Sequence, residues 1–185
     1  NGNNQYVNVG NARSLWVSKH SFTVDAWVYF MSVGEPDQSI VDKMSANGTN
    51  SDGWRLLYQG DYDEFWFCLG AGAGNNGCQL GAPTTVVSTT KVQAKTWYHV
   101  TAVKTATTIS IYVNGNLEAT SDFGSFTDTN STDLLFGVTA SEGKTAWLNG
   151  RIDEVELFKR ALTHSEIFAI YNAGHAGKCK SKEAS

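Results

Sequence analysis

Residues 21–31 read Ser21-Phe22-Thr23-Val24-Asp25-Ala26-Trp27-Val28-Tyr29-Phe30-Met31. Apolar side chains fill every second position from Phe22 to Phe30, and polar or aromatic side chains fill the positions between them. An alternation of period two indicates a β-strand with one face in a core. The segment therefore predicts a long strand in a sheet that buries one of its faces.

Similar patterns, bounded by turn residues, predict further strands along the chain. They lie near residues 5–9, 38–44, 53–59, 63–69, 84–90, 96–104, 107–113, 116–121, 132–139 and 145–158. Asn114-Gly115 separates two of them and predicts a tight hairpin, because a type I′ turn needs positive φ at both central residues. The chain has 18 glycines for turns and only 2 prolines. Pattern and composition together predict an all-β fold.

One short helix is expected near the C-terminus. Thr163-His164-Ser165-Glu166 fits a capping box, in which the Thr163 side chain and the Glu166 side chain satisfy each other's backbone amides. Ile167, Ile170 and Tyr171 then form an apolar stripe, and Gly174 is suited to end the helix. Residues 175–185 are interpreted as a tail or linker.

Size and charge limit the possible functions. The chain has 185 residues with 14 Lys+Arg against 18 Asp+Glu, which suits one domain. It has no basic stripe for phosphates, so no nucleic-acid partner is expected. It has no apolar run of about 18 residues, so no membrane insertion is expected. Any leader peptide is expected to have been removed before Asn1, which is compatible with secretion.

Cys68 and Cys78 flank a glycine-rich stretch, residues 70–77. Such a stretch is flexible enough to bring the two thiols together, which predicts a disulfide and an oxidising compartment. The alternative is two unpaired thiols beside a loop. Cys179 has no predicted partner within this sequence.

Several segments occur in an order and spacing typical of one family. They are Asn1-Gly2-Asn3-Asn4-Gln5-Tyr6-Val7-Asn8-Val9, Ser21–Val28, Ser39–Lys43, Gly53–Leu56, Trp97–Val103, Ile111–Gly115, Leu148-Asn149-Gly150-Arg151-Ile152-Asp153-Glu154-Val155 and Arg160–Thr163. In these segments the chain resembles the laminin-G-like branch of the concanavalin A-like lectin/glucanase superfamily. The resemblance implies a two-sheet antiparallel jelly-roll sandwich over residues 1–174, with the short C-terminal helix. It implies little about the ligand, because this fold supports lectins, adhesion domains and glycosidases.

The segment 54–66 is the leading candidate for a sugar site. Sugar rings stack on aromatic faces, and their hydroxyls need polar partners. The segment supplies both kinds of group in Tyr58, Asp61, Tyr62, Glu64 and Trp66. Strand alternation points Trp66 away from the core, where it would form a stacking platform. The alternative is that Trp66 packs under a neighbouring loop, such as residues 70–77.

Three other tryptophans are expected either to bind sugar or to lie in the core. Trp147, which precedes the last predicted strand, is a second candidate for sugar binding. Trp27 and Trp97 match family positions that are usually buried, so they are expected in the core.

Residues 151–156 are the candidate for a catalytic carboxylate cluster. The glucanases of the superfamily carry three acids on one strand, and retaining hydrolysis needs two carboxyl groups about 5–5.5 Å apart. Here Arg151 stands where the first acid is needed. Simple alternation puts Glu154 and Glu156 on one face and Asp153 on the other, so no catalytic activity is expected.

The resemblance also implies a structural Ca²⁺ site, since many members of the family hold one between the N-terminal loop and the last long strand. Asp153 matches the family's aspartate, and Asn1 or Asn3 matches the N-terminal turn. Asparagine offers a neutral oxygen, which gives a weaker site than a carboxylate. The alternative is that Asp153 forms a turn or a salt bridge with Arg151 or Arg160.

The sequence therefore predicts a secreted or cell-surface, non-catalytic, lectin-like module that binds a polysaccharide or glycan. It would form part of a larger extracellular protein. The alternative is an adhesion module on the same scaffold, with an extracellular protein as partner.

Overall fold

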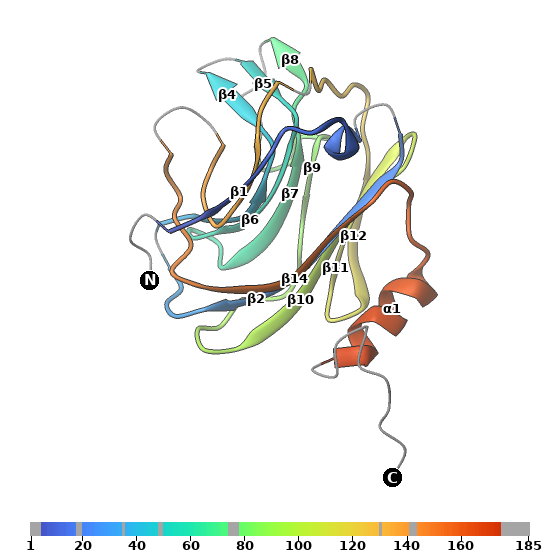
Figure 1. Ribbon diagram of the computed structural model, residues 1–185. Coiled ribbons are helices and arrows are strands. Elements are labelled where there is room, and N and C mark those ends of the chain that lie inside the picture. The colour runs from blue at the N-terminus through green and yellow to red at the C-terminus, as the bar shows by residue number, and fades with distance from the viewer. Residues whose placement is uncertain are drawn as a thin grey trace.

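Two antiparallel sheets stack face to face and enclose one apolar core (Figure 1). The computed structural model describes residues 5–17, 20–34, 36–47, 50–73, 78–129, 131–140 and 144–174. The six-stranded sheet has the order β1 (Val7–Gly10), β13 (Leu134–Phe136), β3 (Gln38–Asp42), β6 (Trp54–Gln59), β7 (Glu64–Leu69) and β9 (Thr85–Val87). The five-stranded sheet has the order β12 (Asn116–Asp122), β11 (Thr108–Val113), β10 (Trp97–Lys104), β2 (Phe22–Phe30) and β14 (Gly150–Phe158). The predicted sandwich is confirmed, and each predicted strand overlaps an observed one.

Strand β2 shows why this sequence forms a sandwich. Its alternate side chains, from Phe22 to Phe30, are all fully buried in the core between the sheets. On β7, Phe65, Phe67 and Leu69 enter the same core from the opposite sheet. Period-two alternation in both sheets thus places two apolar faces against each other.

The β11–β12 hairpin has the predicted turn. Asn114 has a φ of 50° and Gly115 a φ of 78°, which is the left-handed geometry that a type I′ turn requires. A Cβ at Gly115 would lie 3.0 Å from the Phe168 ring. Glycine therefore also lets the hairpin pack against the C-terminal helix.

A small third sheet was not predicted. It contains β4 (Ser45–Asn47), β5 (Asn50–Asp52) and β8 (Gly72–Ala73). These strands have only two or three residues each, too few for an alternation to be recognised. A short 3₁₀ helix, Arg13–Leu15, was also not predicted.

Trp27 and Trp97 do not lie in the core, so that expectation is wrong. Both side chains are only half-buried and lie on the outer face of the five-stranded sheet, because the alternate positions of β2 fill the core. The Trp27 ring packs against Tyr171, with ring centroids 5.9 Å apart, and against His99 at 5.3 Å. The helix, rather than the opposite sheet, covers this aromatic surface.

Strand β14 departs from simple alternation. Asp153 pairs with Trp27, but Glu156 pairs with Asp25, so β14 has one extra residue between these two pairs. Glu154 takes a φ of 49° at this β-bulge. The bulge puts Asp153 and Glu156 on the same outer face, which corrects the predicted pairing of Glu154 with Glu156.

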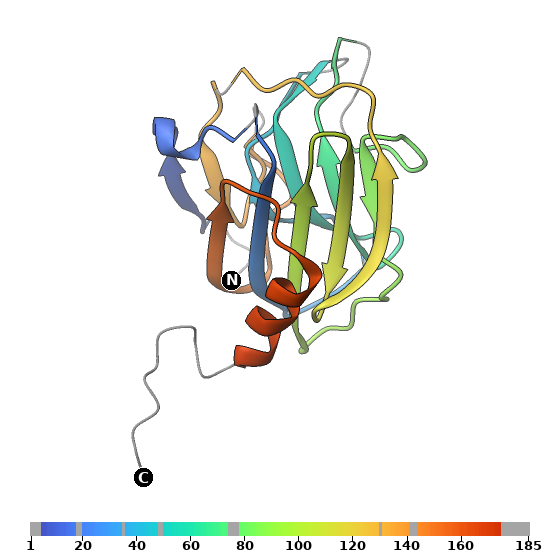
Figure 2. The ribbon, with the colours of Figure 1, turned by 90° about the vertical axis from the view of Figure 1, so that its right-hand side faces the viewer.

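Helix α1 (His164–Ala173) packs on the outer face of the five-stranded sheet, as Figure 2 shows. Its capping box forms as predicted, and Gly174 ends the helix. Ile167 is fully buried against Val103 and Leu162. Within the described residues, this 10-residue helix and the 3₁₀ turn are both too short to cross a membrane.

The predicted disulfide joins Cys68 to Cys78. Cys68 lies on the outer face of β7, in a small apolar cluster with Met44, Leu57 and Trp66. The bond therefore ties Cys78 to the outer face of the six-stranded sheet.

The helix cap predicts a pH-dependent contribution to stability. The hydrogen bonds from Arg160, then those from Thr163, lower the pKa of Glu166 from 4.5 to about 2. Because the folded-state pKa is depressed, this contribution is fully present above pH 4.5 and is lost as the pH falls towards 2. The difference in thermal midpoint between the wild type and Glu166→Gln should therefore shrink over this window. A difference that stays constant across it would contradict this assignment.

Candidate functional site

The turn between β6 and β7 is held from its inner side. The Tyr58 hydroxyl, buried in the core, hydrogen-bonds the Asp63 carboxylate. The Gly34 amide donates to the Tyr58 hydroxyl at 2.6 Å and to Asp63 Oδ1 at 3.2 Å. The Gly60 amide donates to Asp37 Oδ1 at 2.9 Å. Tyr58 therefore fixes the turn from below, and its ring is not available to a ligand.

Trp66 faces away from the main core, as alternation predicts, but it is not exposed. Its side chain is only 3% accessible, covered by Met44, Leu57 and Val87 together with the disulfide. The expectation of an open Trp66 platform is therefore wrong. The alternative of a packed Trp66 is confirmed, but the described cover comes from these residues, and residues 74–77 of the loop named for it lie outside the described residues.

Tyr62 lies above Trp66 and is the exposed ring of this cluster. It is 42% accessible, and the two ring centroids are 5.7 Å apart. Asp61 beside it is exposed, and its backbone amide donates to Gln59 Oε1 at 2.9 Å. Trp66 thus supports Tyr62 from beneath.

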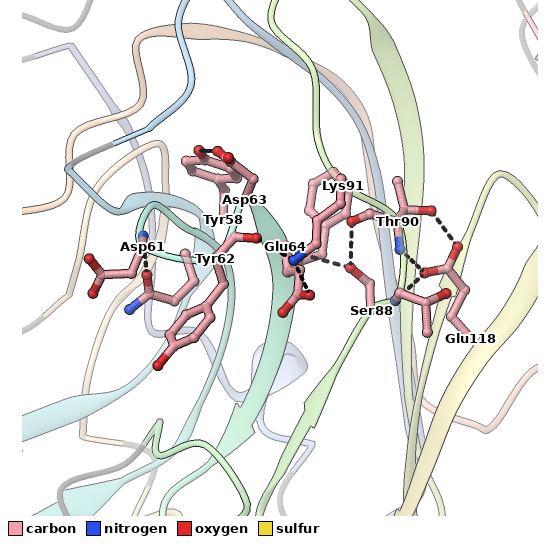
Figure 3. A network of polar contacts seen from close by, with 12 residues as sticks. Tyr58, Asp61, Tyr62, Asp63, Glu64, Ser88, Thr90, Lys91 and Glu118 are labelled. Atoms are coloured by element: carbon pink, nitrogen blue, oxygen red, sulfur yellow. Dashed lines mark hydrogen bonds and ion pairs between the residues drawn. The ribbon is translucent and has the colours of Figure 1, made fainter.

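Lys91 fixes the turn from its outer side (Figure 3). Its Nζ donates to the Tyr62 carbonyl at 2.8 Å and to Glu64 Oε1 at 2.6 Å. Glu64 is therefore engaged in an ion pair and is less free to bind a ligand than the sequence suggested.

The segment that carries Lys91 is itself anchored. Glu118 on β12 accepts hydrogen bonds from the Thr89 and Thr90 amides at 2.8 and 2.9 Å. Ser88 Oγ accepts the Phe65 amide at 2.9 Å. The sequence did not indicate Lys91 or Glu118, because Lys91 meets the turn, and Glu118 meets the segment of Lys91, through contacts between residues about 27–29 positions apart.

Together these contacts make a small, pre-organised surface. Tyr62 offers an aromatic face, and Asp61 offers carboxylate acceptors for hydroxyl groups. A flat ring beside hydrogen-bonding groups is the combination that orients a sugar.

Trp147 belongs to a separate aromatic cluster. Its half-buried ring meets Tyr6 edge-on, with ring centroids 5.9 Å apart. Lys144 Nζ lies 4.8 Å from the centre of the Tyr6 ring. Trp147 therefore stays a second candidate for sugar binding, with Tyr6 as a neighbour that the sequence did not single out.

The predicted calcium ligands are only partly described. Asn1 and Asn3 lie outside the described residues. Asp153 is exposed, and its Oδ1 accepts the Glu154 amide at 2.9 Å. Within the described part of the chain, no group of three or more His, Cys, Asp or Glu side chains is arranged to hold a metal ion. Calcium needs six to eight oxygens, so these residues alone do not complete a site.

The model of a laminin-G-like family, described as the concanavalin A-like lectin/glucanases superfamily, matches residues 1–168. The chain therefore belongs to this superfamily. No curated protein sequence matches it significantly.

Similar solved structures include domains that bind other molecules. One is described as a candidate carbohydrate-binding protein from Bacteroides ovatus, with 20% identity and a TM-score of 0.65 over 89% of this chain and 44% of that one. Another is the binding domain of botulinum neurotoxin DC in complex with rat synaptotagmin II, with 16% identity and a TM-score of 0.62 over 91% of this chain and 40% of that one. The same toxin domain has also been solved with SialylT, again with 16% identity and a TM-score of 0.62, over 91% of this chain and 39% of that one. The chain spans less than half of the length of these neighbours, and the likeness shows the shared fold.

Lys91→Met tests how the turn is held. The Lys91 side chain is largely exposed, so the free energy of unfolding should fall by about 1 kcal/mol or less. Amide hydrogen exchange at residues 61–64 should nevertheless become faster, because the Tyr62 carbonyl and Glu64 lose their common donor. Lys159→Met, at an exposed lysine just after β14, is the matched control. Unchanged protection at residues 61–64 would show that Lys91 does not order the turn.

Proposed function

We propose that this chain is a non-catalytic, lectin-like module that binds carbohydrate at the Tyr62 turn. The single observation that carries the proposal is an exposed tyrosine ring held rigidly beside a free carboxylate. Lys91 holds the Tyr62 carbonyl, Trp66 supports the ring, and Asp61 stands open to solvent. Rigid placement lowers the entropy lost on binding.

The comparisons support this class of ligand. One structural neighbour is described as a candidate carbohydrate-binding protein, and another was solved with SialylT. A third is described in connection with two ganglioside molecules. Fold similarity alone does not assign a function, so the proposal rests on the Tyr62 turn and is only strengthened by these neighbours.

A non-catalytic role follows from the chemistry of β14. The bulge gives Asp153 and Glu156 one common face, but Arg151 stands on that face where the glucanase pattern needs its first acid. A disulfide on the sheet surface suits a secreted or cell-surface protein, because such bonds persist in oxidising compartments.

Adhesion to an extracellular protein is the second candidate function. The observation in its favour is the neighbour solved in complex with rat synaptotagmin II, which is a protein partner. Such a partner would not require Tyr62 or Asp61.

Glycan and polysaccharide arrays test the sugar site. Tyr62→Ala should reduce affinity roughly tenfold or more by removing the stacking face, while thermal stability changes little. Phe168→Ala is the matched control, since this aromatic ring on α1 is 43% exposed against 42% for Tyr62. Binding that survives Tyr62→Ala but is lost in Trp147→Ala would move the site to the second aromatic cluster. No binding by the folded wild type would favour adhesion.

We further propose that Ca²⁺ binds weakly at Asp153 with help from the N-terminal asparagines, as the family resemblance implies. Calcium would stabilise the fold by binding the native state alone. The thermal midpoint should then rise in millimolar Ca²⁺ relative to EDTA, and Asp153→Asn should reduce the rise. An equal midpoint under both conditions would count against a structural calcium ion.

A further inference from the structure

A buried lysine meets the side-chain amide of an asparagine where β1 and β3 end. Lys43 directly follows β3 and is only 1% exposed. Asn11 directly follows β1. The Lys43 Nζ donates to Asn11 Oδ1 at 2.9 Å and to the Thr132 carbonyl at 2.7 Å. Two acceptors therefore hold the amine in one place, directly beside a carboxamide.

Burial prepares Lys43 to act as a nucleophile. A lysine attacks a carbonyl carbon only as the neutral amine, and desolvation favours that form. Burial lowers the pKa of Lys43, and this effect outweighs the nearby carboxylates of Asp128, Asp133 and Asp52, which act in the opposite direction. The neutral amine is therefore more accessible at Lys43 than at a lysine in water.

The carboxamide of Asn11 is polarised for attack. Its Oδ1 also accepts a hydrogen bond from Trp16 Nε1 at 3.1 Å. A donor aimed at a carbonyl oxygen stabilises the negative charge that develops there when a nucleophile adds to the carbon. The Trp16 indole therefore serves the Asn11 carbonyl as a fixed donor.

The reacting atoms are close to one another. Because a C=O bond is about 1.23 Å long, a nitrogen 2.9 Å from Asn11 Oδ1 lies within about 4 Å of Asn11 Cγ. Reacting atoms about 3–3.5 Å apart are in near-attack geometry. A small rotation of the Lys43 side chain is therefore enough to bring Nζ to Cγ.

A carboxylate lies near enough to move the proton. Among the carboxylates that act on Lys43, Asp128 has the largest charge effect, ahead of Asp133 and Asp52. A positioned carboxylate can take a proton from one nitrogen and return it to another. We assign this role to Asp128.

From these observations we propose that Lys43 and Asn11 join in an intramolecular isopeptide bond. The bond from Lys43 Nζ to Asn11 Cγ forms, and the bond from Cγ to Nδ2 breaks. One proton passes from Nζ through the Asp128 carboxylate to Nδ2, which leaves as ammonia. An amine and a carboxamide thus give an amide and ammonia, and the step needs no oxidant, reductant or cofactor.

The bond would fasten an edge strand to the interior of the six-stranded sheet. Among the described strands, β1 pairs only with β13, which lies between β1 and β3. A link between residues 32 positions apart would span the end of β13 and restrict the unfolded chain. This cross-link serves stability and is separate from carbohydrate binding at Tyr62.

Mass spectrometry of the wild-type chain tests the proposal. After reduction of the disulfide, the intact mass should be lower than the sequence mass by one molecule of ammonia. Trypsin should then release a peptide of residues 1–13 linked to a peptide of residues 20–55 that is uncleaved after Lys43. A full sequence mass would overturn the proposal, as would loss of ammonia without this linked peptide.

Lys104 is the matched control within the same molecule. It is 5% exposed, and burial lowers its pKa as well. Its Nζ, however, donates to the backbone carbonyls of His20 at 3.4 Å and Thr105 at 3.1 Å, and neither carbonyl carries a side-chain amide. No peptide should therefore be linked through Lys104. Links of equal abundance at both lysines would contradict a reaction directed by the Asn11 geometry.

Variants separate the reacting groups from the proton carrier. Asn11→Ala and Lys43→Met should each retain the full sequence mass. Asp128→Ala, shown to be folded by circular dichroism, should contain at least about tenfold less linked peptide, because proton transfer by a positioned group contributes a factor of this size or more. An undiminished linked fraction in Asp128→Ala would overturn the role of Asp128. The wild-type mass needs no variant to fold, so it decides the proposal by itself.

Discussion

Strand β2 is the constraint on which the structure depends, because its inner face is buried along its whole length and its outer face is buried at Thr23 and Asp25. The inner face supplies apolar side chains from Phe22 to Phe30 to the core between the sheets. On the outer face, Thr23 and Asp25 are fully buried although they are polar. Thr23 Oγ1 donates to the Arg160 carbonyl at 3.0 Å and accepts the Leu162 amide at 2.9 Å. The segment that leads into α1 is therefore fastened to the centre of the five-stranded sheet, and β10 and β14 are aligned on either side of β2.

In the proposed sugar site, some residues support the turn and another is exposed to solvent. The residues that sequence patterns favoured as ligand contacts, Tyr58 and Trp66, instead support the turn from inside. Tyr62 alone of the three rings reaches solvent, and it does so on a turn fastened by Asp63 below and Lys91 above. The hydrogen bonds of Asp63 and the ion pair of Lys91 with Glu64 thus position one exposed ring, and a small surface gains rigidity in this way without a deep pocket.

Local patterns predicted the elements well, because alternation and capping depend only on neighbouring residues. The strands around residues 22–30, the Asn114-Gly115 turn, the Thr163 cap and the Cys68–Cys78 bond all belong to this category. The burial of Trp66 could not be predicted, because its cover comes from Met44, just after β3, and from Val87 on β9. The bulge in β14 shifted the carboxylates for a comparable reason: an extra residue is visible only in the pairing with β2. The family could be recognised from the sequence because many short segments, each weak evidence by itself, occur in the order typical of the family.

Helix α1 has a consequence for how the domain can be divided. All strands of the sandwich are complete at Phe158, so a boundary drawn there would seem natural from the sheets alone. Such a cut would remove Tyr171 from beside His99, whose side chain is 1% exposed and whose Nε2 lies 4.0 Å from Oδ1 of the buried Asp25. Water would then reach a titratable pair in the middle of the sheet, and the outer aromatic face of Trp27 would become an adhesive surface. Recombinant fragments and fusion junctions should therefore keep the chain through Gly174.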